Sequence, residues 1–141
     1  MTPQQITLVQ DSFAILVPKR ECVAALFYAK LFERDPSLRA LFPAELDEQG
    51  RKLMQVLATV VHSLHKIEIM LPAVDDLARR HVGYGVREEH YATVGEALLE
   101  TLAQGLGDAF CAETREAWSA AYGLLSGRMM AVAYCCEVAA A

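Results

Sequence analysis

Three polar side chains of this sequence fall on helix faces that are otherwise apolar, and each could do chemistry there. His81 extends the apolar stripe of one helix, Gln49 lies one turn before Leu53, and Tyr28 lies inside the run FYAKLF. A neutral imidazole can bind a metal ion, while a phenol and an amide can donate hydrogen bonds to a bound ligand. A polar group left unpaired in a core costs about 1–3 kcal/mol, so each of the three needs a partner.

Each residue also has an ordinary structural explanation. A histidine on an apolar face is commonly held by a backbone carbonyl, and His81, near the glycines that end its helix, could also act as a C-cap. A tyrosine such as Tyr28 usually packs in the core with its hydroxyl at the rim. Gln49, near a helix start, could cap that helix. Taken one by one, these positions leave the structural and the functional readings open.

The elements that carry these residues are helical almost everywhere, because apolar residues recur at spacings of three and four. Thr2, Pro3 and Gln5 have the pattern of a capping box with proline in the first turn. Residues 67–71 are expected to form a corner, with Pro72 opening a helix that stops at glycines 83 and 85. The other expected helices begin near residues 2, 18, 36, 47, 88 and 112, and the one that begins near residue 36 is short.

Composition limits the class of protein. The chain has 141 residues, of which 54% are hydrophobic and 22% charged, with a net charge of −5. The length fits one domain, and the helical pattern predicts an all-α fold whose unequal helices do not suit a simple four-helix bundle. The negative charge argues against nucleic-acid binding, and no apolar run is long enough for a membrane span. Without a recognisable signal peptide, a cytoplasmic location is expected.

The four cysteines are Cys22, Cys111, Cys135 and Cys136. None forms a C-x-x-C pair, and two adjacent cysteines rarely bridge each other because the geometry is strained. Reduced thiols are the expected state, and covalent attachment of a c-type haem is not indicated.

Several motifs taken together carry a family resemblance. Arg-Arg-His is followed by Tyr-Gly-Val, then by His-Tyr-x-x-Val-Gly, and later by Ala-Trp-x-x-Ala-Tyr-Gly. Between Ile6 and about Val132 the sequence resembles the globins, specifically bacterial haemoglobins related to the haem domain of flavohaemoglobins. The resemblance implies a single globin domain over residues 1–141, with helices A, B, C, E, F, G and H and a short or absent D. It also implies haem b (iron protoporphyrin IX) as the cofactor, which would account for the excess of apolar residues.

In that family, the histidine at the position of His81 is the proximal ligand of the haem iron. Its second ring nitrogen must then donate to an acceptor, for which the carbonyl one turn earlier, near Leu77, is the expected group. Phe42 matches the ring that packs on the haem face, and Leu53 matches the apolar side chain above the iron. The remaining haem-contacting positions implied by the resemblance are Val86, Tyr91 and Val94, with Lys52 or Arg80 as a partner for a haem propionate.

Tyr28 and Gln49 match the distal polar pair of the family, whose hydrogen bonds stabilise bound O2. The resemblance therefore implies reversible binding of O2, NO and CO with slow release of O2, which suits retention or chemistry better than delivery. The alternative is an NO dioxygenase, which would need a separate flavoprotein reductase as electron donor. No nucleic acid or membrane partner is expected, and the chain is expected to be a monomer or a weak homodimer.

One position departs from the flavohaemoglobin pattern. There the proximal histidine is accompanied by a tyrosine, matched here by Tyr91, and by a glutamate, whose position falls on Ala133. Glu137 lies one turn later and could substitute. Without the glutamate, the electron donation that favours O–O cleavage should be weaker, which favours ligand binding over peroxidase-like activity.

A second histidine pattern has metal-ligand spacing. His62, His65 and Glu68 form H-x-x-H-x-x-E on and after the long helix. By the 100° step of a helix, His62 lies away from Gln49 and Leu53, so a solvated face is the expected reading.

Overall fold

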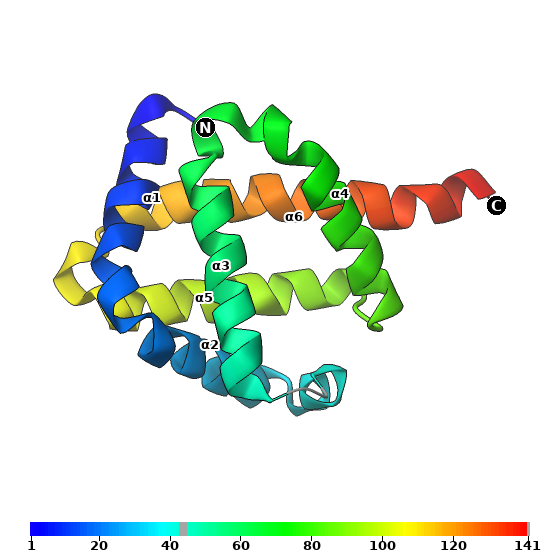
Figure 1. Ribbon diagram of the computed structural model, residues 1–141, viewed down its shortest axis with the longest axis horizontal. Helices are drawn as coiled ribbons and strands as arrows, with labels where there is room; N and C mark the ends of the chain where they lie inside the picture. Colours follow the sequence, from blue (N-terminus) through cyan, green and yellow to red (C-terminus); the bar gives the residue numbers. More distant parts are fainter. Residues whose placement is uncertain (43–44, 141) are drawn as a thin grey trace.

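The computed structural model confirms an all-α chain (Figure 1). It describes residues 1–42 and 45–140, with residues 134–140 described by their backbone only, and these residues contain no strand. Six α-helices account for most of the chain: α1 (Pro3–Leu16), α2 (Arg20–Arg34), α3 (Leu46–His62), α4 (Ile67–Gly83), α5 (Glu88–Leu106) and α6 (Ala112–Ala140). Short 3-10 helices lie between them at Val17–Lys19, Pro36–Leu41, Leu64–Lys66 and Gly107–Ala109.

The helix starts follow the predicted capping chemistry. The Thr2 hydroxyl accepts a hydrogen bond from the Gln5 amide, and the Gln5 side chain accepts one from the Thr2 amide, both at 3.1 Å. This reciprocal pair is the predicted capping box of α1. Asp35 caps the Pro36–Leu41 segment by accepting from the Ser37 amide at 3.1 Å. That segment is a 3-10 helix, a tighter form common in short pieces.

The predicted corner at residues 67–71 is wrong. Helix α4 begins at Ile67 and continues through Pro72 to Gly83, so the proline lies inside the helix instead of opening it. Proline removes the amide that would bond to the Glu68 carbonyl and normally costs about 3 kcal/mol or more in a helix interior. Tertiary packing overrides this preference: Met70, before the proline, and Val74, after it, belong to one apolar cluster.

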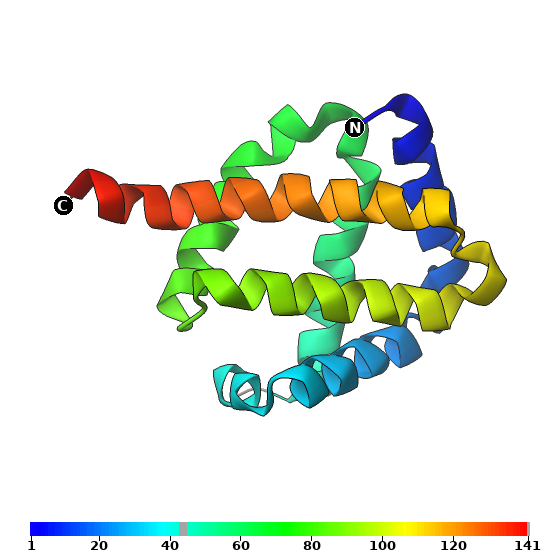
Figure 2. The same ribbon diagram turned by 180° about the vertical axis from the view of Figure 1, so that it is seen from behind.

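The helices cross in a few layers (Figures 1 and 2). Helices α5 and α6 run side by side, and α3 crosses them steeply on the face turned to the viewer in Figure 1. Helix α3 also crosses α2 closely, since a Cβ built on Gly50 would lie 3.0 Å from the Ala24 Cβ. This close approach brings the start of α3, and with it Gln49, next to the middle of α2.

The core has two parts. The larger cluster joins α1, α2, α3, α5 and α6, and contains Trp118, whose indole donates to the buried Ser12 hydroxyl at 2.8 Å. The smaller cluster forms where α4 meets α5 and α6, and its buried members are Val74, Ala78, Tyr91 and Met129. Helix α4 is therefore held by the smaller cluster, while the other five long helices pack together in the larger cluster.

No single helix in the described part of the chain has the length and hydropathy to cross a membrane. Helix α3 and the segment Leu64–Gly83 pass that test only as a pair, which is bent by 58°.

Candidate functional site

His81 lies in the last turn of α4, and its ring is half-buried. Its Nδ1 lies 2.8 Å from the carbonyl oxygen of Leu77, which confirms the predicted partner one turn earlier. A carbonyl oxygen carries no proton, so Nδ1 must be the donor in this contact. In the neutral ring, the lone pair then lies on Nε2, which is the nitrogen left for a metal ion.

The surroundings of His81 favour the neutral ring. Burial lowers its pKa below the usual value, and the charge of Arg80 lowers it further. The hydrogen bond to the Leu77 carbonyl acts in the opposite direction but is smaller than the effect of burial. A neutral imidazole is the form that can bind a metal ion.

The chain turns sharply just after His81. Tyr84 donates its amide to the carbonyls of Arg80 and His81, both at 3.1 Å, and closes the last turn of α4. Gly85 has φ of +92°, a conformation that favours glycine. Of the two glycines expected to end the helix, Gly83 is its final residue and Gly85 makes the turn. Tyr84, which had no predicted role, lies with its ring centroid 5.9 Å from that of His81.

Tyr28 and Gln49 are brought together although 21 residues separate them along the chain. Tyr28 is only 4% exposed, and its hydroxyl donates to the backbone carbonyl of Gln49 at 3.4 Å. This distance lies beyond the usual range, so the bond is weak. Burial raises the pKa of Tyr28 to about 12, with a smaller lowering from a hydrogen bond with Gln49. The phenol therefore stays protonated and remains a donor at neutral pH.

Phe42 joins the same group through aromatic contacts. Its ring centroid lies 5.4 Å from that of Tyr28 and 5.7 Å from that of Phe32, in edge-to-face arrangements. Phe32 also stacks on Tyr28 with centroids 6.0 Å apart. Phe32 was not among the predicted site residues, although its spacing of four residues from Tyr28 places the two rings on one face of α2.

The other predicted apolar positions divide between the two core clusters. Leu53 and Val94 are half-buried and pack against the larger cluster. Val86 packs against the smaller cluster, of which Tyr91 is a buried member. These predicted positions therefore belong to both parts of the core, and they do not together line one cavity wall.

The two predicted propionate partners are exposed. Arg80 forms an ion pair with Asp76 one turn earlier on α4, with Nε and Oδ2 3.2 Å apart. Lys52 lies on the exposed side of α3. Both cations can reorient, because an exposed pair at this spacing contributes only about 0.3–0.5 kcal/mol.

A cavity of about 210 Å³ lies between α3 and α4. Its walls are mainly apolar, with Val56 and Val60 from α3, and Val74 and Leu77 from α4. Arg80 reaches it from the turn that carries His81. Sequence reasoning missed Thr59 and Met70, which also line it, because a cavity wall depends on how two helices face each other.

Ala133, where the flavohaemoglobin resemblance predicts that a glutamate is absent, can be placed from the packing. Ala133 is half-buried and packs against the cluster that contains Tyr91, so an apolar methyl group stands at this position. The Tyr122 hydroxyl donates to the Tyr91 carbonyl at 2.5 Å and ties α6 to the start of α5. The side chain of Glu137 lies outside the described residues, as do those of Cys135 and Cys136.

The second histidine pattern is not assembled into a cluster. His62 and His65 are exposed, and the His62 ring makes an edge contact with Phe13 at a centroid distance of 6.5 Å. Within the residues that the structure describes, no three His, Cys, Asp or Glu side chains are grouped as a metal site would require. Cys22 and Cys111 are exposed and free.

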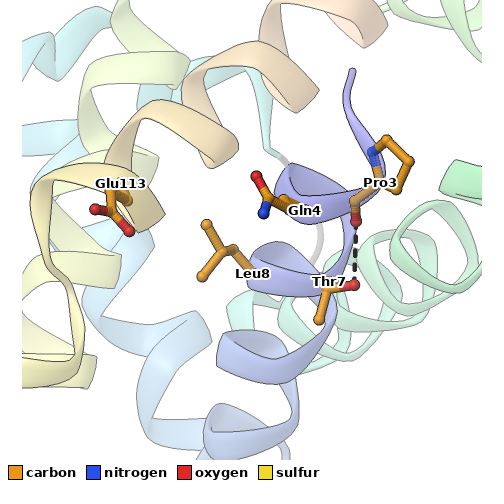
Figure 3. A pocket seen from close by; sticks show the side chains of 5 residues that line it. All are labelled: Pro3, Gln4, Thr7, Leu8 and Glu113. Carbon is orange, nitrogen blue, oxygen red and sulfur yellow. Dashed lines mark hydrogen bonds between the residues drawn. The ribbon is translucent and has the colours of Figure 1, made fainter.

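A larger hollow of about 440 Å³ lies at the surface between the start of α1 and the start of α6. Figure 3 shows Gln4 and Leu8 of α1 extending towards Glu113 of α6, while the Thr7 hydroxyl donates to the Pro3 carbonyl. Among the described side chains, no histidine, tyrosine or cysteine lines it. Of the predicted site residues, Arg80 lines the cavity between α3 and α4. Tyr28, Gln49 and Phe42 form a separate group where α2 meets the start of α3.

Comparison with known proteins points to one family. The family model "Globin" matches residues 25–129. A flavohemoprotein of Deinococcus radiodurans is 37% identical over 136 residues, which cover 94% of this chain and 34% of that protein. A flavohemoprotein of Bordetella parapertussis is 34% identical over 129 residues, covering 89% of this chain and 32% of the relative. The chain thus spans about a third of the length of these relatives.

Solved structures agree with the sequence matches. A bacterial globin from Campylobacter jejuni superposes with a TM-score of 0.85 at 28% identity, covering 97% of this chain and 99% of that one. An engineered carbene transferase from Rhodothermus marinus, provisionally a nitric oxide dioxygenase, superposes with a TM-score of 0.87 at 25% identity. That match covers 99% of this chain and 97% of the other.

Proposed function

Because this chain belongs to the globin family, we propose that it holds haem b between α3 and α4 and reversibly binds O2, NO and CO. His81 is the proposed ligand of the haem iron. The observation that carries the proposal is the contact of its Nδ1 with the Leu77 carbonyl at 2.8 Å, which orients the ring and leaves Nε2 as the coordinating atom.

The residues present fit such a group. An apolar plate needs apolar walls, and α3 and α4 supply them from Val56, Val60 and Leu77 around a mainly apolar cavity. Phe42 supplies an aromatic face beside Tyr28. The exposed cations Lys52 and Arg80 could each pair with a carboxylate at the edge of the group. The remaining contacts would come from Val86, Tyr91 and Val94.

The haem iron, when bound, supplies the affinity for diatomic gases. The chain supplies the polarity of the pocket. The Tyr28 hydroxyl is protonated, and its bond of 3.4 Å to the Gln49 carbonyl is weak enough to be exchanged for a better acceptor. A bound gas with a partial negative charge is such an acceptor, and the amide of Gln49 offers a second donor. We expect this pair to slow the release of O2.

The proposed role of His81 is tested by the absorption spectrum. The freshly expressed protein should show a Soret band, and the His81→Ala variant should retain haem poorly and show an altered band. His65→Ala is the matched control, because His65 is an exposed histidine on the Leu64–Lys66 turn. A His81→Ala variant with full haem content and an unchanged spectrum would contradict the role of His81 as the iron ligand.

A second candidate function is NO dioxygenation, in which O2 and NO give nitrate and a separate flavoprotein reductase returns the electron. It is favoured by the buried phenol of Tyr28 and by relatives named flavohemoprotein, whose length is about three times the matched region. The test is nitrate formation from NO over many turnovers with an added flavoprotein reductase and NADH. Nitrate in a single stoichiometric burst only, with reductase present, would leave the ligand-binding function standing and reject the enzymatic one.

A further inference from the structure

Helix α4 has an unusual position among the helices because it packs mainly on one neighbour, α6. Both α3 and α4 lie wholly in the described part of the chain, and they make few direct contacts with each other. The buried residues that hold α4 against α6 are Val74 and Ala78 on one side and Met129 on the other. The contacts between α4 and α6 therefore determine where the last turn of α4 lies.

An ion pair stands at the edge of this contact. The Arg128 guanidinium of α6 donates to both carboxylate oxygens of Asp75 on α4, from Nε to Oδ1 at 2.7 Å and from Nη2 to Oδ2 at 2.8 Å. The Asp75 side chain is only 18% exposed, so the pair is partly shielded from water. The hydrogen bonds from Arg128 lower the pKa of Asp75, and the carboxylate stays charged at neutral pH.

The ion pair between Asp75 and Arg128 fixes the relative orientation of the two side chains as well as the distance between them. A guanidinium that binds a carboxylate with two parallel hydrogen bonds fixes the relative orientation of the two planes, which a single point contact does not. Asp75 follows Val74 and precedes His81 by six residues, or about 9 Å along the helix axis. Restraining Asp75 therefore restrains both the rotation of α4 about its axis and its sliding along α6.

We propose that Asp75 and Arg128 are positioning residues for His81: by fixing the rotation of α4 and its place along α6, they set where the imidazole would be held for the haem iron. This inference rests on the proposed function of His81. The pair acts through the helix and touches neither His81 nor the gas ligand. The pair would therefore change the strength of the bond between the His81 imidazole and the iron. This effect is separate from any contribution of the pair to the stability of the fold.

Resonance Raman spectroscopy of the ferrous, gas-free protein reads that bond directly through the iron–histidine stretching band. We expect Asp75→Asn and Arg128→Gln each to shift or broaden the band. The double variant should shift it no further, because both changes remove the same contact. The matched control is Arg34→Gln, which breaks an exposed arginine's ion pairs with Glu96 and Glu100 between α2 and α5, away from α4.

A second measurement covers variants that retain haem poorly. In the haem-free protein, amide hydrogen exchange at residues 77–82 should be faster in Asp75→Asn than in Arg34→Gln, by a factor on the order of ten. An unchanged Raman band, or equal exchange in the two variants, would overturn the positioning role. A wild-type protein with haem but no iron–histidine band would instead reject the proposed function of His81, and the exchange data would still decide whether the pair restrains α4.

Discussion

The Tyr28 hydroxyl is the group through which this chain would act on a bound gas. Its ring is fixed by Phe32 and Phe42, so the hydroxyl has little freedom apart from its own rotation. The weak bond to the Gln49 carbonyl keeps it oriented towards the start of α3. A donor already held in place loses little entropy when it binds a ligand, which makes its hydrogen bond more effective.

Replacing Tyr28 by Phe removes this donor and keeps the ring. A neutral hydrogen bond contributes about 0.5–1.5 kcal/mol, which corresponds to O2 dissociation that is about two- to tenfold faster. Stopped-flow measurement of the O2 dissociation rate tests this. Tyr84→Phe is the control, because Tyr84 is 58% exposed. Equal rates in wild type and Tyr28→Phe would remove the role assigned to the phenol.

Tyr28 also predicts how stability depends on alkaline pH. Burial raises its pKa from 10.0 to about 12 in the folded protein, so the unfolded chain loses this proton first as pH rises. Below pH 10 the protonated phenol contributes its full share to stability. Between about pH 10 and 12 the free energy of unfolding should fall by about 1.4 kcal/mol per pH unit from this group.

Urea unfolding of the haem-free protein between about pH 9 and 11.5 measures this fall. Tyr28→Phe should lack the contribution of Tyr28 and show a shallower decline. Burial also raises the pKa of Tyr122, whose contribution is common to both proteins. Parallel curves for the two proteins would show that the phenol is not buried as described.

Among the elements, α5 and α6 approach each other closely at Gly95. A Cβ built there would lie 2.7 Å from Cε2 of Tyr122, whose hydroxyl is itself held by the Tyr91 carbonyl. Because that ring is tied at its far end, it cannot move aside without losing the hydrogen bond. Glycine at position 95 therefore allows α5 and α6 to pack at their observed separation.

We expect Gly95→Ala to lower the free energy of unfolding by about 1–3 kcal/mol, the usual cost of overfilling a core. Gly123→Ala on α6 is the matched control, because nothing lies within 4 Å of a Cβ built at that position. There, alanine should stabilise by about 0.5–1 kcal/mol through helix propensity alone. Thermal or urea unfolding measures both, and a stabilised Gly95→Ala would contradict the close packing of the two helices.

A structural feature could be predicted from the sequence when the residues that form it lie close together along the chain. The capping box at Thr2 and the bond from His81 to Leu77 involve residues three or four apart, and both were predicted. Helix α4 was predicted to begin at Pro72 because proline disfavours a helix interior, yet packing of its first turns overrides that preference. The contact between Tyr28 and the Gln49 carbonyl depends on the crossing of α2 and α3, which no spacing within either helix indicates.

At the scale of the whole molecule, α3 and α4 enclose a mainly apolar cavity between them and make few direct contacts with each other. The cavity of about 210 Å³ lies there, and Val56 on its wall is 36% exposed. The larger core holds five helices together without α4. The sequence indicates the apolar cavity only indirectly, through a hydrophobic content of 54%, which is high for a small protein.

A haem that fills this region should stabilise the entire protein. With free haem at about a thousandfold excess over its Kd, binding to the folded state adds about 4 kcal/mol to the free energy of unfolding. Thermal unfolding followed by circular dichroism, without haem and with haem in excess over the protein, measures the rise in Tm. The His81→Ala variant should gain much less, and an equal gain in both proteins would mean that haem binds without the histidine.

The one-sided packing of α4 also bears on the order of events during folding. We expect a helix that gains few contacts until its neighbours are assembled to form after the rate-limiting step, when α1, α2, α3, α5 and α6 already share their core. Interactions made after that step change the unfolding rate and leave the folding rate nearly untouched. Bound haem would then lower the unfolding rate of this chain, and the lifetime of the native state would depend on how long the cofactor stays bound.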